Sequence, residues 1–141
     1  PAVIKEFYEA SQAGVQIDLI VRGTCCLKPG ITNVSENIRV VSVVGRFLEH
    51  SRVYHFLNAE HSVYCSSADL MERNLSNRIE VCFPILKKKH ANRIIEELKV
   101  YLESPTQTWE LNFKGEYIER SRQENDQLDV QTELLNKLTQ T

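Results

Sequence analysis

Long hydrophobic runs are missing from this sequence: no stretch approaches the ~20 apolar residues that a membrane-spanning helix requires. A signal-peptide pattern is missing too, because residues 1–14 (PAVIKEFYEASQAG) have the spacing of an amphipathic helix. Neither sign of charge dominates, since the net charge is −2, so no overall field attracts nucleic acid or anionic membrane. We therefore predict a cytoplasmic protein with no nucleic-acid partner, in which any anion site is built locally. Peripheral membrane association stays open.

The cysteines show no metal-binding spacing. The four cysteines, none of which forms a CxxC pair, are Cys25, Cys26, Cys65 and Cys82. This usage is typical of reduced, buried cysteines in a cytosolic protein. A disulfide or a metal site is the alternative, which the absent ligand spacing disfavours. We expect no metal ligands in this chain.

The length is that of one domain, since domains commonly span ~100–150 residues and this chain has 141. The sequence begins with Pro1 and enters a helical pattern directly, which suggests a piece of a longer protein. We predict an α/β core over residues 1–118, followed by a polar segment and a terminal helix over residues 119–141.

Hydrophobic periodicity predicts three helices. Helical spacing marks residues 3–8, with Gly14 as a stop, and residues 90–104, which end before Pro105. The apolar positions of a short final helix are Val130, Leu134, Leu135 and Leu138. These helices lie at both ends of the chain and late within it.

Alternating apolar residues predict strands between the helices. Residues 16–23 read as a strand buried on both faces, whereas residues 38–47 fit either a strand or a strand-turn-helix. Further predictions are a hairpin over 52–58 and 62–67, a strand over 78–85, and a small hairpin or extended piece over 108–119. Strands interleaved with helices indicate α/β layers, and the short connections between the middle strands favour a mixed sheet.

Polar and charged residues gather where the predicted strands end. The candidates are Arg22 after the first strand; Glu49, His50 and Arg52 before the middle hairpin; Ser66, Ser67 and Asp69 after it; and Arg73, Asn77 and Arg78 before the next strand. Ligands of open α/β sheets bind at strand termini, where the backbone is rigid and side chains clear the core. These residue types in that place point to a site for phosphate or another anion.

Arginine and histidine would supply the chemistry of such a site. Arginine presents a planar fork that matches two phosphate oxygens and stays charged. Histidine titrates near neutrality, so His50 could exchange a proton or attack phosphorus. Structural roles stay open as well: surface ion pairs of Arg52 or Arg78 with Glu49 or Glu80, a cap at Asp69, a structural role for His55, and loop positions for His61 and His90.

Three blocks in a fixed order carry a family resemblance. They are DLIVRGTCCLKPG (18–30), SENIRVVSVVGRFLEHSRVYHF (35–56) and YCSSADLMERNLSNRIEVCFPI (64–85). Together they closely resemble the C-terminal half of polyphosphate kinase of the bacterial, histidine-dependent type. Residues 94–104 and 108–118 are similar to the end of that family.

The resemblance implies a fold and an activity. The family transfers the γ-phosphoryl group of ATP reversibly to inorganic polyphosphate, through a phosphohistidine and with Mg2+. Its two similar catalytic domains have a phospholipase-D-like α/β fold, a mixed β-sheet flanked by helices, and their shared site lies where they meet. This chain resembles the second domain. The preceding domain would then carry the phosphorylated histidine and most of the Mg2+ ligands, and the whole protein would form a homo-oligomer.

The matching motifs also imply residue roles. Arg22 in VRG, His50 in EHSR and Arg78 in NLSNR correspond to family residues at the phosphates of ATP or ADP, with His50 as the catalytic one. Possible supporting residues are Glu49, Arg52, Ser66, Ser67, Asp69 and Arg73.

The broader phospholipase-D pattern is not fully met. That pattern pairs H-x-K with an acid downstream, whereas here Arg52 replaces the lysine and Leu57-Asn58 occupies the region of the acid. This departure disfavours a phosphodiesterase, which remains one alternative. The other is a module that binds nucleotide or polyphosphate and is inactive alone.

Overall fold

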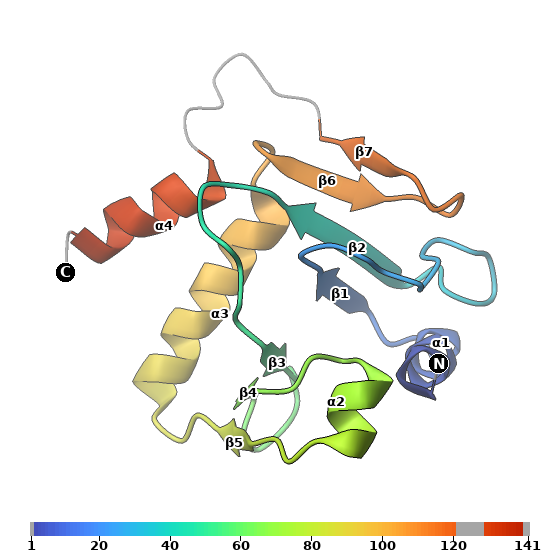
Figure 1. Cartoon of the computed structure of the whole chain (residues 1–141), viewed down its shortest axis with the longest axis horizontal. Coiled ribbons are helices and arrows are strands. Elements are labelled where there is room, and N and C mark those ends of the chain that lie inside the picture. Colours follow the sequence, from blue (N-terminus) through green and yellow to red (C-terminus); the bar gives the residue numbers. More distant parts are fainter. Residues whose placement is uncertain (1, 121–128, 140–141) are drawn as a thin grey trace. The chain divides into compact units, whose positions relative to one another are not determined.

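The computed structural model describes residues 2–120 and 129–139. It divides the chain into two compact units, which are considered separately: unit 1 comprises Pro1–Leu48 and Val100–Thr141, and unit 2 comprises Glu49–Lys99. Residues 121–128 of the predicted polar segment lie outside the described residues. Figure 1 shows the elements in chain order.

Unit 1 is built on a four-stranded mixed sheet with the order β1-β2-β6-β7 (Figure 1). Its strands are β1 (Ile17–Ile20), β2 (Ile38–Val43), β6 (Thr108–Leu111) and β7 (Tyr117–Glu119). β1 runs parallel to β2, and the β2–β6 and β6–β7 pairs are antiparallel. The predicted mixed α/β fold is confirmed, residues 38–47 contain a strand, and residues 108–119 form a hairpin.

The prediction that the first strand is buried on both faces is wrong. None of its four residues is fully buried, because the Asp18 side chain is exposed and the other three are half-buried. β1 is also an edge strand, which pairs only with β2. There Asp18 accepts a hydrogen bond from Arg39 Nε at 2.7 Å. The central strand β2 is instead the buried one, with Val40 and Val41 fully inaccessible.

The core of unit 1 joins this sheet to the first helix. Leu27, Ile38, Val40 and Leu111 are buried, and half-buried side chains of α1 (Ala2–Gln12) pack against them. Gly14, at φ 87°, follows the helix in the left-handed conformation that glycine adopts without strain. The predicted amphipathic helix is therefore confirmed, and its apolar side chains pack against the core of the sheet.

Two helices from the C-terminal part of the chain also contribute to unit 1. α4 (Val130–Thr139) begins after Asp129, whose Oδ1 accepts the Thr132 amide at 3.0 Å as an N-cap. α3 (Lys88–Glu103) ends within unit 1, where Arg120 donates to the Leu102 carbonyl at 2.6 Å. That contact satisfies a carbonyl left without an intrahelical partner at a helix end. The predicted late and final helices are confirmed.

Unit 2 holds a three-stranded antiparallel sheet with the order β3-β4-β5. Its further elements are β3 (Val53–His55), β4 (Val63–Ser66), α2 (Glu72–Asn77), β5 (Cys82–Pro84) and the start of α3. The predicted middle hairpin is confirmed. β5 is shorter than the predicted strand over 78–85, because pairing with β4 begins only at Cys82. The backbone is already extended at Arg78.

Some local predictions need correction. All four cysteines are free thiols, but Cys26 and Cys82 are exposed rather than buried. His90 lies in the first turn of α3 rather than in a loop. Among the described residues, no helix is both long enough and apolar enough to cross a bilayer.

Candidate functional site

Arg52 organises the polar residues around His50 in unit 2. Its Nε and Nη2 donate to Asp69 Oδ1 at 2.9 and 2.8 Å. Its Nη1 lies 3.0 Å from His50 Nδ1 and also donates to the His50 carbonyl at 2.9 Å. The side chains of Arg52 and Asp69 are only 20% and 30% exposed. The ion pair of Arg52 is therefore made with Asp69, a partner that the sequence analysis did not consider.

The antiparallel pairing of β3 with β4 explains why these residues meet. Arg52 directly precedes β3, and its carbonyl accepts the Ser66 amide at 2.9 Å, which extends the ladder by one bond. The segment that leaves β4 therefore starts beside the segment that enters β3. Asp69 lies three positions beyond Ser66 and reaches back to the guanidinium. The predicted clustering at strand ends holds for His50, Arg52 and Asp69.

A second polar cluster surrounds Glu80. Its carboxylate accepts hydrogen bonds from the Ser67 hydroxyl and, at 3.1 Å, from Asn74 Nδ2. The bonds from Ser67 and Asn74, together with the nearby charges of Arg78 and Arg52, hold the pKa of Glu80 below its ordinary range. Asn74 is buried, and its Oδ1 has no partner among the described residues.

The other predicted site residues of unit 2 differ in whether their side chains are hydrogen-bonded. The Ser66 hydroxyl accepts a hydrogen bond from the Ala68 amide at 3.0 Å, and the Ser67 hydroxyl accepts one from the Val81 amide at 3.0 Å. Both serines therefore bind backbone amides close to the ends of β4 and β5. Arg73 and Arg78 are exposed and form no hydrogen bond or ion pair with any described residue. Of the two, Arg78 lies close enough to act on the Glu80 carboxylate.

Arg22 lies in unit 1, two residues after β1. The strand's pairing continues through the Val21 amide, which donates to Val41 O at 2.8 Å, and Arg22 itself is exposed. Directly after it, the Gly23 carbonyl accepts a hydrogen bond from the Tyr117 hydroxyl at 2.9 Å. Tyr117 was missed because nothing in the local pattern of residues 108–119 points to the β1 end.

The turn before His50 has its own anchor within unit 1. Gln131 Nε2 donates to Phe47 O at 2.8 Å, and Gln131 Oε1 accepts the Phe47 amide at 2.7 Å. A Cβ atom on Gly45 would lie 2.5 Å from Gln131 Oε1, so any larger residue there would displace this amide from the Phe47 backbone. The contact of Gln131 with the segment around Gly45 was not predicted, because the two positions lie far apart along the chain.

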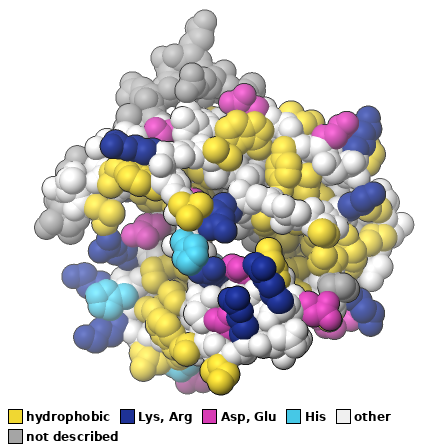
Figure 2. Space-filling view, viewed as in Figure 1, with side chains coloured by type: hydrophobic (Ala, Val, Ile, Leu, Met, Phe, Trp, Pro, Cys, Tyr) yellow, Lys and Arg dark blue, Asp and Glu magenta, His cyan; other side chains and the backbone are white. Residues whose placement is uncertain are grey.

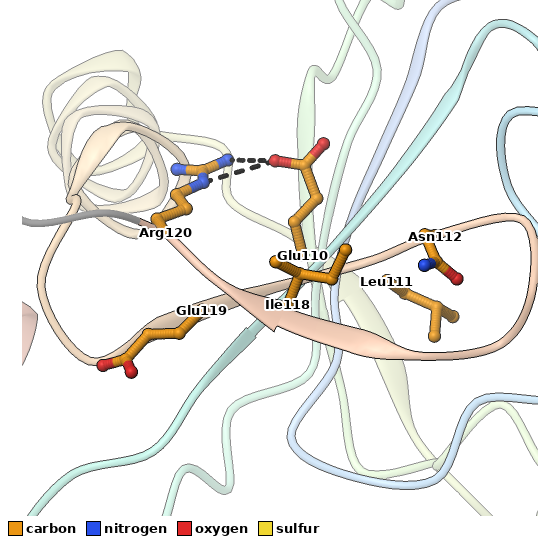
Figure 3. A pocket seen from close by; sticks show the side chains of 6 residues that line it. All are labelled: Glu110, Leu111, Asn112, Ile118, Glu119 and Arg120. Carbon is orange, nitrogen blue, oxygen red and sulfur yellow. Dashed lines mark hydrogen bonds and ion pairs between the residues drawn. The ribbon is translucent and has the colours of Figure 1, made fainter.

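A pocket on the β6–β7 hairpin contains none of the predicted site residues (Figure 3). Its volume is about 300 Å³. Arg120 and Glu110 form an ion pair there at 3.2 Å, and Glu119 points away from that pair. Because Arg120 also closes the end of α3, we assign this pair a structural role.

The exposed charges are mixed in sign. On the face shown in Figure 2, basic side chains (dark blue) stand among acidic ones (magenta) instead of covering a continuous area. The described part of the chain also contains no group of three or more His, Cys, Asp or Glu side chains that could hold a metal ion.

The comparisons with known proteins agree on one family. The model of the family "Polyphosphate kinase C-terminal domain 2" matches residues 1–131. The chain is 54% identical over 140 residues to the polyphosphate kinase of Pseudomonas aeruginosa, covering 98% of this chain and 20% of that protein. It is 54% identical over 133 residues to the polyphosphate kinase of Bacillus cereus, covering 94% and 19%.

A solved structure gives the same result. The crystal structure of polyphosphate kinase from Porphyromonas gingivalis superposes with a TM-score of 0.91 at 38% identity, over 99% of this chain and 22% of that one. The chain belongs to the polyphosphate kinase C-terminal domain 2 family, so the predicted resemblance is confirmed. It spans about a fifth of the length of the relatives it matches.

Proposed function

We propose that this chain supplies the nucleotide-phosphate half of the active site of a polyphosphate kinase. The enzyme would transfer the γ-phosphoryl group of ATP reversibly to inorganic polyphosphate, through a phosphohistidine on a preceding catalytic domain. The observation that carries the proposal is the anchoring of His50 by Arg52 and Asp69, within a chain that belongs to this family. An exposed histidine held by a half-buried ion pair suits a ligand contact that must be placed accurately.

Each candidate has a role that its chemistry supports. Arg22 and Arg78 are exposed and would neutralise phosphate oxygens of the nucleotide. His50 would contact the oxygen that ADP retains when the γ-phosphoryl group leaves. Phosphoryl transfer depends mainly on positioning and on neutralising charge, which arginine forks and a fixed imidazole can supply.

The proposal extends to what the rest of the polypeptide provides. Mg2+ would accompany ATP, with its ligands mainly on the preceding domain. Without that domain the chain would bind nucleotide or polyphosphate and transfer nothing. The domain would have the phospholipase-D-like fold, and the whole protein would form a homo-oligomer. It would be located in the cytoplasm, with or without peripheral membrane contact.

The test measures ATP:polyphosphate phosphotransfer by the full-length polypeptide that contains this chain. Charge-assisted hydrogen bonds contribute about 1.5–3 kcal/mol, so Arg22→Ala and Arg78→Ala should each lower kcat/KM roughly 10- to 150-fold. Arg93→Ala is the matched control, because Arg93 pairs with Glu97 on the surface of α3 at 3.0 Å. Losses no greater than that of the control would overturn the proposed function.

A further inference from the structure

The contact between Arg52 and His50 restricts which ring nitrogen of the histidine carries hydrogen. A guanidinium has only N–H donors and never accepts. Since Arg52 Nη1 lies 3.0 Å from His50 Nδ1, Nδ1 must offer a lone pair to it. A neutral imidazole that accepts at Nδ1 carries its hydrogen on Nε2.

Arg52 is held firmly enough to impose this state. Two of its nitrogens donate to Asp69 Oδ1 at 2.9 and 2.8 Å, and Nη1 is also bonded to the His50 carbonyl. With the guanidinium bonded to both Asp69 and the backbone, its orientation toward Nδ1 does not depend on the histidine ring. No described residue bonds His50 Nε2, and His50 is exposed, so Nε2 is open to a ligand.

We propose that Arg52 is a positioning residue that fixes His50 as the Nε2–H tautomer, which makes His50 a hydrogen-bond donor and prevents it from acting as a nucleophile. Attack on phosphorus requires a free lone pair on nitrogen. The lone pair of Nδ1 is engaged by Arg52, and Nε2 holds a hydrogen. A carboxylate in the place of Arg52 would do the reverse, because it would accept Nδ1–H and leave the Nε2 lone pair free.

This inference rests on the proposed function for its ligand and deepens it. The Nε2–H group would donate to a phosphate oxygen of the nucleotide and would not itself be phosphorylated. The chain would therefore contribute only donors to the phosphates, namely Arg22, Arg78 and His50, and the phosphoryl-accepting nitrogen would come from elsewhere in the polypeptide.

The first experiment observes the tautomer directly. The 141-residue chain, labelled with 15N at histidine, is studied by long-range 1H–15N correlation, and the His50 signals are assigned from the His50→Gln variant. We expect a non-protonated Nδ1 and a protonated Nε2, and loss of this preference in Arg52→Gln. Arg39→Gln is the control, because Arg39 forms a comparable pair with Asp18 at 2.7 Å. A hydrogen on Nδ1 with Arg52 in place overturns the inference, whatever the enzyme's activity.

The second experiment separates a donor from a nucleophile in the full-length polypeptide. Glutamine keeps an N–H donor that alanine lacks, so His50→Gln should retain at least tenfold more kcat than His50→Ala, with similar KM for ATP. Equal loss in both variants contradicts the donor role. Arg52→Lys should lower kcat when His50 is present. In the His50→Gln background the same substitution should cause no further loss, because Arg52 acts through His50. Since Arg22 and Arg78 test the proposed function separately, failure of either idea can be recognised.

Discussion

The hydroxyl of Tyr117 in β7 donates a hydrogen bond of 2.9 Å to the carbonyl of Gly23, across 94 residues of sequence. Gly23 directly follows Arg22, so this bond holds the backbone beside the proposed phosphate contact. Tyrosine is protonated at neutral pH, and burial and the nearby Cys25 raise the pKa of Tyr117 further, so its hydroxyl can donate. Further along the same loop, the Tyr8 hydroxyl accepts a hydrogen bond from the Lys28 amide at 2.9 Å.

Removing the Tyr117 hydroxyl should weaken nucleotide binding. A hydrogen bond contributes about 0.5–1.5 kcal/mol, so Tyr117→Phe in the full-length polypeptide should raise the Kd for ATP roughly 2- to 13-fold. The control is Tyr8→Phe, which removes a hydroxyl of α1 that contacts the same loop at Lys28, six residues after Arg22, and should leave the Kd unchanged. Isothermal titration provides the measurement, and equal Kd values for the two variants would contradict a role for Tyr117 in placing Arg22.

Gly45→Ala should destabilise unit 1. The new Cβ would lie 2.5 Å from Gln131 Oε1, and this side chain cannot withdraw without breaking both of its bonds to the Phe47 backbone. Forcing an extra methyl group into an occupied space typically costs about 1–3 kcal/mol of unfolding free energy.

Urea unfolding of the chain measures this cost. Gly23→Ala is the control for stability, because an added Cβ there meets no atom within 4 Å. Gly45→Ala should also cost less in a Gln131→Ala background, where the clash is gone. A Gly45→Ala variant as stable as Gly23→Ala would show that the Gln131 contact is not maintained in solution.

The Glu80 cluster should make the stability of unit 2 depend on acid pH. Hydrogen bonds from Ser67 and Asn74 lower the pKa of Glu80 in the folded chain, so the unfolded chain binds this proton more readily. The stabilisation is therefore complete above the ordinary glutamate pKa of ~4.3 and is lost as the pH falls through the lower folded value. Glu80→Gln should reduce the fall in Tm below that pH.

The comparison that decides this is a series of Tm measurements between neutral and strongly acidic pH. Glu72→Gln serves as the control, because Glu72 forms no side-chain hydrogen bond or ion pair with the described residues. Parallel pH profiles for wild type and Glu80→Gln would mean that Ser67 and Asn74 do not favour the charged form of Glu80.

Patterns within short windows of sequence predicted most elements correctly. The apolar stripes of α3 and α4 repeat at the helical period, and the β3–β4 and β6–β7 hairpins follow from alternating residues around short turns. The division of the strands into two sheets and the edge position of β1 were not predicted, because periodicity describes one strand and says nothing of its neighbours.

For the candidate site, too, local motifs were predicted and contacts between distant segments were not. Its residue types and the family were read from motifs that are continuous in sequence, such as EHSR and NLSNR, and the family is confirmed. The partner of Arg52 was not predicted, since Asp69 lies 17 residues away and meets it only through the antiparallel pairing of β3 with β4.

The sequence by itself thus determined the helices, the hairpins and the family, and it supplied Arg22, His50 and Arg78 as candidates for a phosphate site. Tertiary structure alone decided the partners: Asp69 for Arg52, Tyr117 for Gly23 and Gln131 for Phe47. The physical reason is that local periodicity reflects which side of an element faces the core, whereas a side-chain hydrogen bond between distant segments depends on strand order and register. Those are set only when the whole sheet assembles.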